Sequence, residues 1–180
     1  GALTDDKAYI NVKSLLNSFH HEGIPVGINR SVSFRSPEFP AALNSRWGEE
    51  EGIDASSARS CNDVISDILE AEKTKISFIC LGSMSTALNA LRNIPEFSGQ
   101  VKDFIWSADG ADDKAGFNYN IDMKSSVSIL KQEIPVKIVR KYMLNESVFW
   151  DNDLIEAVKD INTRYAGTVG SVTVFSGPHR

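Results

Sequence analysis

Residues 75–139, KISFICLGSMSTALNALRNIPEFSGQVKDFIWSADGADDKAGFNYNIDMKSSVSILKQEIPVKIV, decide the fold of this chain. Three short runs in this stretch predict strands, because they are apolar and rich in β-branched and aromatic residues: 75–81, 101–108 and 135–139. The central run of 75–81 is apolar enough to predict a strand that is covered on both faces. Strands that alternate with helices need crossover connections, so the sequence predicts an α/β fold with a mostly parallel, open sheet and helices on both faces.

Helical spacing of apolar residues fills the intervals and extends the pattern in both directions. The expected helices are 5–21, 59–70, a helix that begins at Ser85 or Thr86 and ends at Arg92, 122–132 and 151–164, and the further expected strands are 24–28 and 170–175. A hydroxyl of Ser85 or Thr86 is expected to cap its helix, and Asp122 is a candidate N-cap for the next one. In contrast, 30–57 contains prolines, serines and three consecutive glutamates, which predict a long surface loop.

Size and charge limit the class of protein. A chain of 180 residues with 42% hydrophobic and 24% charged residues is expected to form one soluble globular domain, 1–180. Its net charge of −5 argues against nucleic acid or an anionic membrane as the main partner. Apolar runs fall short of the ~20 residues that cross a bilayer. Cys61 and Cys80 are expected to be free buried thiols, so the cellular compartment stays open.

Parallel sheets bind ligands beyond the carboxyl ends of their strands, and three segments follow such ends. The first, 82–86 (GSMST), is either a glycine turn that offers main-chain groups to a ligand or a plain strand-to-helix turn. The second carries Asp109, Asp112 and Asp113, which suit a hard cation such as calcium or form a solvated loop. In the third, 116–122, Asn118 could bind sugar hydroxyls or shape the turn.

The order of these segments resembles the inosine-uridine-preferring nucleoside hydrolase family. Residues 82–88 (GSMSTAL) resemble the family's GPLTNLA turn, and 93–106 (NIPEFSGQVKDFIW) resemble its DPEL…IKRIVVMGG helix end and strand. Residues 116–122 (GFNYNID) fall where the family has EFN…D before a helix. Residues 134–136 (IPV) match a strand entry, and 11–28 are similar to the helix that leads into the family's IPV strand.

The resemblance, which covers about two thirds of the chain, implies a nucleoside hydrolase-like (Rossmann-like) core, a nucleoside or ribose-like sugar as ligand, and calcium as cofactor. Members of the family bind calcium through an N-terminal DxDxxxDD cluster, a later Asp and the carbonyl of the Thr in GPLTN. That Thr corresponds to Ser85, whose main-chain carbonyl is therefore the candidate metal ligand. The resemblance places the substrate against Asn118, Asp109 and Met84.

This sequence also departs from the family pattern. The chain begins near the end of the family's second strand, so it is expected to be N-terminally truncated and to lack DxDxxxDD. Gly116 stands where the family has the Glu of EFN, which removes one carboxylate that grips the ribose. The region after Tyr142 does not match the family's C-terminal catalytic His-Asp pair.

Three functions remain open at this point. The first is a divergent N-glycosidase whose missing aspartates are supplied from outside this chain, and it predicts calcium binding once they are supplied. The second is a non-catalytic module that binds a sugar or nucleoside around Asn118. The third is a structural or interaction domain in which the exposed sheet edge left by the absent first strand pairs with a partner, and it predicts an oligomer that breaks into unstable monomers. Because the metal ligands are incomplete, the sequence favours a hydrolase-like protein with impaired catalysis.

Overall fold

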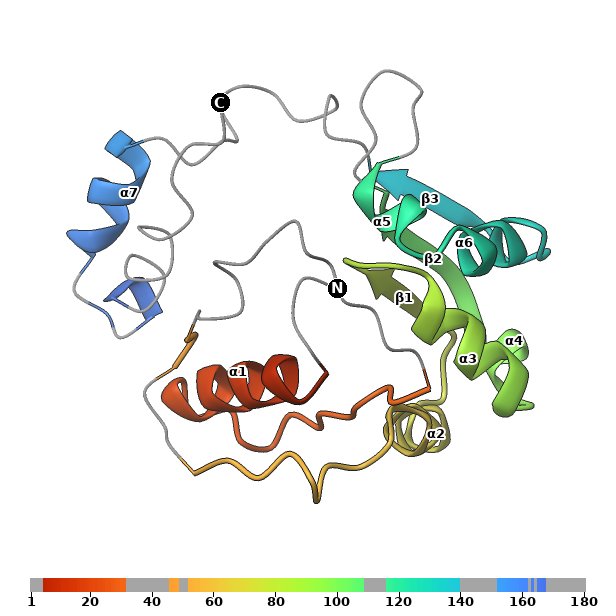
Figure 1. Cartoon of the computed structure of the whole chain (residues 1–180), viewed down its shortest axis with the longest axis horizontal. Coiled ribbons are helices and arrows are strands. Elements are labelled where there is room, and N and C mark those ends of the chain that lie inside the picture. The colour runs from red at the N-terminus through yellow and green to blue at the C-terminus, as the bar shows by residue number, and fades with distance from the viewer. Residues whose placement is uncertain are drawn as a thin grey trace.

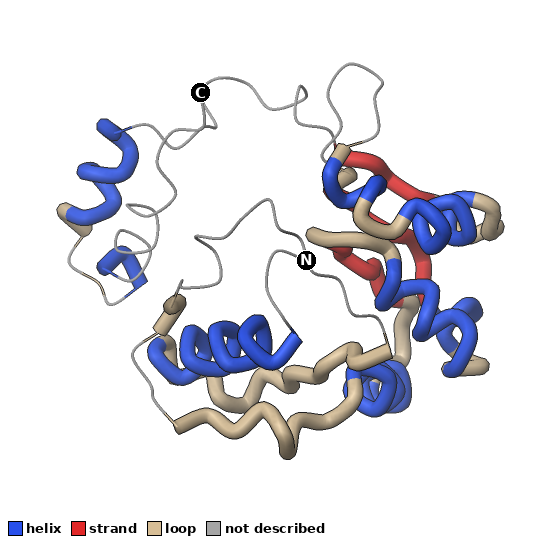
Figure 2. Tube along the Cα trace, in the orientation of Figure 1, coloured by secondary structure: helices blue, strands red, loops and turns tan. Residues whose placement is uncertain are grey.

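The computed structural model describes residues 5–31, 46–48, 52–108, 116–139, 152–161, 163 and 165–167 (Figure 1). Its helices and strands, in chain order, are α1 (Asp5–Ser18), α2 (Cys61–Ala71), β1 (Ile76–Cys80), α3 (Ser85–Asn93), α4 (Phe97–Gln100), β2 (Val101–Ser107), α5 (Phe117–Asn120), α6 (Met123–Leu130), β3 (Val136–Val139) and α7 (Asn152–Lys159). Strands and helices alternate from β1 to β3, which confirms the predicted α/β class (Figure 2).

The three strands form one sheet in the order β1-β2-β3, and both pairings are parallel. Phe104 of β2 lies opposite Phe78 of β1 and Val136 of β3, so one apolar row crosses the whole sheet. Because side chains alternate along a strand, the next positions form a second row on the opposite face. The parallel sheet predicted from 75–81, 101–108 and 135–139 is confirmed.

One face of the sheet packs against helices and forms the core. Phe97, Phe104, Trp106, Met84 and Ile129 are almost fully buried there, and they come from α4, β2, the turn before α3, and α6. The ring of Phe78 meets the ring of Phe97 edge-on, with a centroid distance of 5.7 Å. Apolar burial on this scale is the main stabilising contribution to the fold.

The opposite face is open along the described strands. This open sheet face consists of Ile79, Ile105, Lys137 and Val139, with the carboxylate of Asp103 beneath Lys137. Ile79 is 63% exposed and Val139 is 41% exposed. The prediction that 75–81 is covered on both faces is therefore wrong, because the described helices that contact the sheet lie on its other side (Figure 1).

Lys137 and Asp103 form an ion pair on the open sheet face, so their opposite charges neutralise each other. The ammonium of Lys137 lies 2.6 Å from Oδ2 of Asp103, whose side chain is 3% exposed. The hydrogen bond from Lys137, assisted by the hydroxyl of Ser77, holds the pKa of Asp103 below its ordinary value. Asp103 is therefore ionised at neutral pH, and its charge is balanced within the sheet.

The predicted strand 24–28 is wrong, because the described structure contains only an isolated parallel bridge between Ile28 and Ser60. Ile24 is 49% exposed, so the start of the apolar run does not enter the core. Gly27 permits the bridge, since a Cβ at this position would lie 2.8 Å from the Cα of Cys61. The backbone of this segment therefore runs close to the start of α2 without extending the sheet.

The predicted helix 5–21 ends earlier, at Ser18, and buries a different face. Its buried residues are Asn11, Ser14 and Ser18, while the apolar side that was expected to be buried is only half-buried. Gly48 packs directly on this helix, because a Cβ there would lie 2.4 Å from the backbone of Ser14. A tight main-chain contact from a distant segment thus selects the small polar side of α1.

The remaining helix predictions differ in outcome. Helix α2 is confirmed, with the hydroxyl of Ser60 accepting a hydrogen bond from the N–H of Asp63, although Ile68 is 37% exposed. Met84, which has no side-chain cap hydrogen bond, precedes α3, so the expected hydroxyl cap is wrong. The expected helix 151–164 is shorter, as α7, and the expected strand 170–175 lies outside the described residues.

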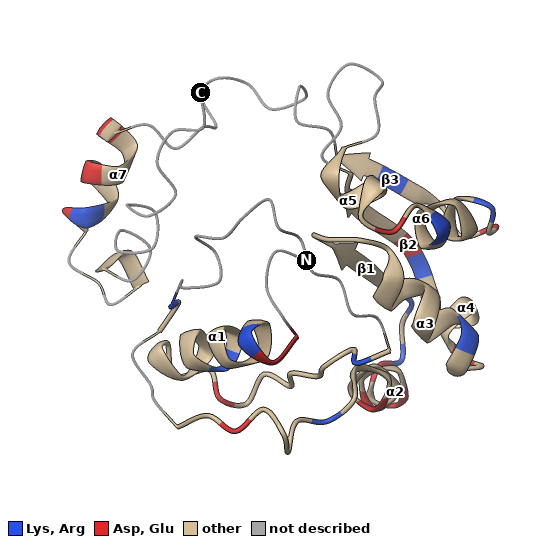
Figure 3. Cartoon of the chain, in the orientation of Figure 1, with Lys and Arg blue, Asp and Glu red and all other residues tan. Residues whose placement is uncertain are grey.

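Charged side chains are scattered over the described elements. In Figure 3 both signs of charge occur on α1, β2 and α7, whereas α2 carries acidic side chains and β3 carries a lysine. Among the helices of the described ranges, none has the length and apolar character that spanning a bilayer demands.

Candidate functional site

The carboxyl ends of β1 and β2 lie at one edge of the sheet because the two strands are parallel and in register. Residues 82–84 leave β1 in a turn, and α3 begins at Ser85. Residues 116–122 return to the same edge, where α5 ends and Asp122 starts α6. We call this edge, with Gly82, Ser83, Ser85, Asn118 and Asp122, the carboxyl-edge site.

Asn118 joins the two strand ends with one carboxamide. Its Nδ2 donates to the carbonyl of Leu81 at 3.2 Å and to the carbonyl of Ser107 at 2.8 Å. The residue is only 6% exposed. Both amide hydrogens are therefore used by the main chain, so Asn118 shapes the edge, and a contact with a sugar would have to use its Oδ1.

A chain of hydroxyls leads from the turn to a carboxylate. The hydroxyls of Ser83 and Ser85 lie 2.7 Å apart, and the hydroxyl of Ser85 donates to Oδ2 of Asp122 at 2.6 Å. The other oxygen, Oδ1, accepts from the N–H of Ser125 at 3.0 Å, which confirms Asp122 as an N-cap. This arrangement ties the start of α3 to the start of α6.

The hydrogen bonds of Asp122 decide its charge. Burial acts to raise the pKa of this carboxyl, but the hydrogen bonds from Ser125 and Ser85 favour the carboxylate and outweigh it. The net result is a pKa below the ordinary value of an aspartate. Asp122 is therefore a carboxylate at neutral pH, with both oxygens accepting hydrogen bonds.

The carbonyl groups of the turn face the core. The indole Nε1 of Trp106 donates to the carbonyl of Gly82 at 2.9 Å. The thiol of Cys80 lies 3.3–3.4 Å from the carbonyls of Gly82 and Ser83. Burial raises the pKa of this thiol, so it stays protonated and keeps its weak donor. The prediction that Cys80 and Cys61 are free and buried is confirmed.

The predicted site residues come together only in part. Ser85 and Asn118 both lie at the carboxyl edge, whereas Met84 is 0% exposed and belongs to the hydrophobic core. The side chain of Met84 is therefore closed to a substrate in this conformation. Asp109, together with Asp112 and Asp113, lies outside the described residues. Roles in substrate binding for these residues stay predictions.

The residues described at this edge do not fit a calcium ion. Calcium binds 6–8 oxygen ligands, yet no group of three or more His, Cys, Asp or Glu residues gathers anywhere in the described ranges. At the edge, both oxygens of Asp122 accept hydrogen bonds from Ser85 and Ser125. Ser85 is the first residue of α3, where a carbonyl is directed along the helix toward the N–H four residues later.

The sequence patterns did not reveal the long-range bonds of the site. Asp122 carries a local N-cap signal, but Ser85, its second partner, lies 37 positions away in the chain. The bond from Trp106 to Gly82 spans 24 positions. The glycine turn and its hydroxyls in 82–86 indicate where the site lies. They do not indicate that Ser85 bonds Asp122 or that Gly82 bonds Trp106.

The chain is an α/β protein, and its fold matches the folds of nucleoside hydrolases among solved structures. A purine-preferring ribonucleoside hydrolase from Gardnerella vaginalis matches with a TM-score of 0.74 and 16% identity, over 96% of this chain and 59% of that chain. A plant nucleoside hydrolase matches with a TM-score of 0.69 and 17% identity, over 97% of this chain and 59% of that one.

A third solved structure supports the same fold. The inosine-uridine-preferring nucleoside hydrolase from Bacillus anthracis matches with a TM-score of 0.58 and 15% identity, over 68% of this chain and 44% of that chain. This chain thus spans 44–59% of the length of these three proteins. No family model and no curated protein sequence matches this chain.

Proposed function

We propose that this chain binds a nucleoside or a ribose-like sugar at the carboxyl-edge site and does not by itself cleave the N-glycosidic bond. The observation that carries this proposal is the fold match to a purine-preferring ribonucleoside hydrolase over 96% of the chain. The rigid edge built by Asn118 supports it, because a ligand loses least free energy when the groups that contact it are already ordered.

The chemistry of the described edge supports binding more than hydrolysis. Attack of water on an anomeric carbon needs a general base or a metal ion that activates the water. The carboxylate of Asp122 accepts hydrogen bonds on both oxygens, and its pKa lies below the ordinary value, which makes it a weak base. No catalytic step is therefore assigned to this residue or to calcium.

A calorimetric titration of the purified chain with inosine and with ribose, each with and without calcium, tests this function. We expect inosine or ribose to bind, and we expect calcium to leave the affinity unchanged within about twofold, because the described edge has no cluster of ligands for it. Release of hypoxanthine from inosine, followed by absorbance, should stay at the rate without protein.

Two outcomes would contradict the proposal. Calcium that binds near one ion per chain, accompanied by base release, would establish a self-sufficient hydrolase. Failure of both inosine and ribose to bind would remove the binding function and favour an interaction domain. A purine-preferring ribonucleoside hydrolase, assayed in the same way, provides the positive control for base release.

A second candidate function, homo-oligomerisation, is favoured by the open sheet face. Parallel sheets are normally buried on both faces, yet Ile79 and Val139 are 63% and 41% exposed. A two-fold contact pairs a surface with itself, so any unbalanced charge would meet its own copy. The open sheet face avoids this repulsion because Lys137 is paired with Asp103.

Sedimentation equilibrium tests this candidate with a pair of substitutions. Ile79→Ser together with Val139→Ser should weaken self-association at least about tenfold, because each lost apolar side chain removes about 1 kcal/mol or more of burial. The matched control is Leu130→Ser, which changes a side chain that is 43% exposed on α6. Monomers at high concentration, or equal association of all three proteins, would rule out pairing through this face.

A further inference from the structure

A cleft of about 360 Å³ lies between residues 28–31, the start of α2 and the outer side of α3. Its polar lining includes Asn29, Arg30, Ser60, Asn62, Asn89 and Asn93. Ser85, Asn118 and Asp122 do not line it, so the cleft is separate from the carboxyl-edge site. Asn29 of the lining donates from Nδ2 to Oγ1 of Thr86, the residue that follows Ser85, at 3.1 Å.

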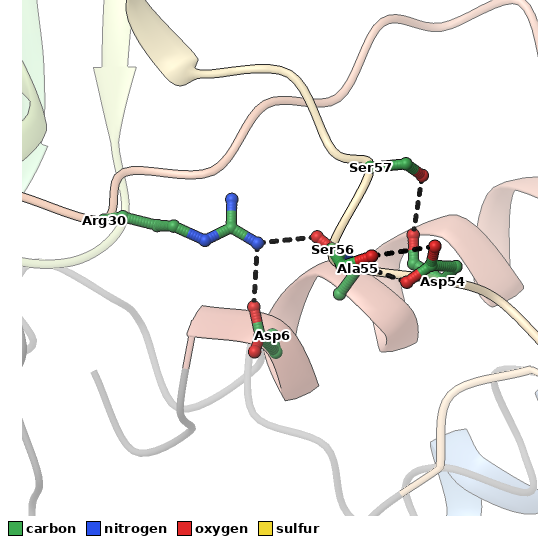
Figure 4. A network of polar contacts seen from close by, with 6 residues as sticks. All are labelled: Asp6, Arg30, Asp54, Ala55, Ser56 and Ser57. Carbon is green, nitrogen blue, oxygen red and sulfur yellow. Dashed lines mark hydrogen bonds and ion pairs between the residues drawn. The ribbon is translucent and has the colours of Figure 1, made fainter.

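The described lining of the cleft contains one charged side chain, which is paired with a carboxylate outside the lining. Arg30 is its cation, and Nη2 of this residue bonds Oδ1 of Asp6 at 3.1 Å and the carbonyl of Ala55 at 2.6 Å (Figure 4). Asp54 braces the same loop by accepting bonds from the N–H and hydroxyl of Ser56. No Asp or Glu is among the described lining residues, so a metal ion is not the favoured ligand, and the pairing of Arg30 with Asp6 disfavours an isolated anion.

A chain of carboxamides forms one wall of the cleft. Nδ2 of Asn89 donates to Oδ1 of Asn62 at 3.1 Å, and Nδ2 of Asn93 donates to Oδ1 and to the carbonyl of Asn89, both at 2.7 Å. The thiol of Cys61, whose pKa is raised by burial, adds a weak bond to Oδ1 of Asn62. These bonds hold the carboxamides in fixed orientations before any ligand arrives.

The same bonds leave one donor and one acceptor for a ligand. Within the described part of the chain, Nδ2 of Asn62 and Oδ1 of Asn93 take no part in the carboxamide chain. These two groups stand at the two ends of the carboxamide chain, and each can pair with a hydroxyl of a ligand, since a hydroxyl both donates and accepts. The described lining contains no aromatic ring on which a nucleobase could stack.

We propose that this cleft is a second ligand site, which binds a small neutral sugar through the carboxamides of Asn62 and Asn93. A volume of about 360 Å³ is at the small end of ligand pockets, which suits one monosaccharide ring better than a whole nucleoside. The site does not depend on the proposed nucleoside-binding function, because the two share no residue.

Nuclear magnetic resonance titration of the ¹⁵N-labelled chain with D-glucose and with D-ribose tests the proposal. We expect saturable shifts of the side-chain NH₂ signals of Asn62, Asn89 and Asn93 with at least one of the two sugars. Asn93→Ala, at an exposed position, should raise the Kd about tenfold, and Asn62→Ala should do the same, because each removes a hydrogen bond to the ligand. Gln132→Ala, which changes an exposed carboxamide that donates to the carbonyl of Ser128, is the matched control and should leave the Kd unchanged.

Two results would overturn the site. Shifts of these signals that rise linearly without saturation, for both sugars, would mean non-specific contact. Saturable binding that Asn93→Ala leaves unchanged would place the sugar elsewhere. Asn118→Ala separates this proposal from the carboxyl-edge function, because it should weaken inosine binding and leave the response of Asn62 and Asn93 to the sugar intact. The exposed variant Asn93→Ala keeps the test decisive should Asn62→Ala fail to fold.

Discussion

Asn118→Ala is expected to lower the free energy of unfolding by about 2–3 kcal/mol, which would make it one of the most damaging substitutions at the carboxyl edge. The reason is the double role of its Nδ2, which donates to the carbonyls of Leu81 and Ser107 at the ends of two neighbouring strands. Alanine leaves both carbonyls without this donor. Urea denaturation followed by circular dichroism measures the change.

A matched pair of variants separates loss of volume from loss of the donor. Asn118→Asp keeps the size of the side chain but turns the donor into an oxygen that faces two carbonyl oxygens, so it should be at least as destabilising as Asn118→Ala. Gln132→Ala, whose carboxamide is exposed and caps no strand, should change stability by less than about 0.5 kcal/mol. A stable Asn118→Ala variant that loses only inosine binding would show that Asn118 serves the ligand and not the fold.

Asp122→Ala is expected to cost about 2–3 kcal/mol at neutral pH, because it removes the N-cap of α6 and the bond to Ser85 together. The effect depends on pH in a defined direction. The folded-state pKa of Asp122 lies below its unfolded value, so the carboxylate stabilises the fold above about pH 4. This contribution is lost as the pH falls through the folded-state pKa.

Thermal unfolding of the wild type and Asp122→Ala between pH 7 and pH 2 measures this dependence. The difference in stability between them should be largest at neutral pH and should shrink below about pH 4. Ser83→Ala is the smaller control, since Ser83 contacts Ser85 and not the carboxylate itself. A difference that stays constant down to pH 2 would mean that the charge of Asp122 contributes nothing.

The sequence predicted the sheet because its strands carry their signal locally. The runs that became β1, β2 and β3 are each short, apolar and followed by a helical pattern, so neighbouring residues were sufficient. The run at 24–28 is also short and apolar, but it forms only one bridge, at Ile28, since pairing depends on where a partner lies. Composition cannot supply that partner.

Helix α1 shows a second limit of sequence patterns. The pattern predicts that its apolar side is buried. Gly48 instead approaches Ser14 so closely that the side with Asn11, Ser14 and Ser18 is the buried one. Such a contact joins segments more than thirty residues apart. The apolar periodicity of α1 does not predict this contact. The structure explains why residue 48 is a glycine, because a side chain there would collide with the backbone of Ser14.

The candidate site divides along the same line. The sequence predicts Asp122 as a cap because its partner Ser125 lies three residues away. Its bond to Ser85 forms only because the starts of α3 and α6 lie at the same edge of the folded sheet. Met84 lies in the glycine turn that predicts a ligand contact, but its side chain is fully buried because it packs into the core beneath that turn. The sequence therefore predicts bonds between near neighbours in the chain, but it does not predict which way each side chain points in the fold.

The order β1-β2-β3 has a consequence for the handedness of the fold. Crossovers between parallel strands are right-handed, so strands that are added in one direction place all their connecting helices on the same side of the sheet. The open sheet face is thus a product of topology rather than of local sequence. A strand that followed β3 in the chain and paired with the edge of β1, which bonds only β2 among the described strands, would reverse the direction of winding and bring its connecting helix to the open sheet face. The crevice of the reversed sheet would then open beside β1, next to Gly82, where doubly wound sheets bind their ligands.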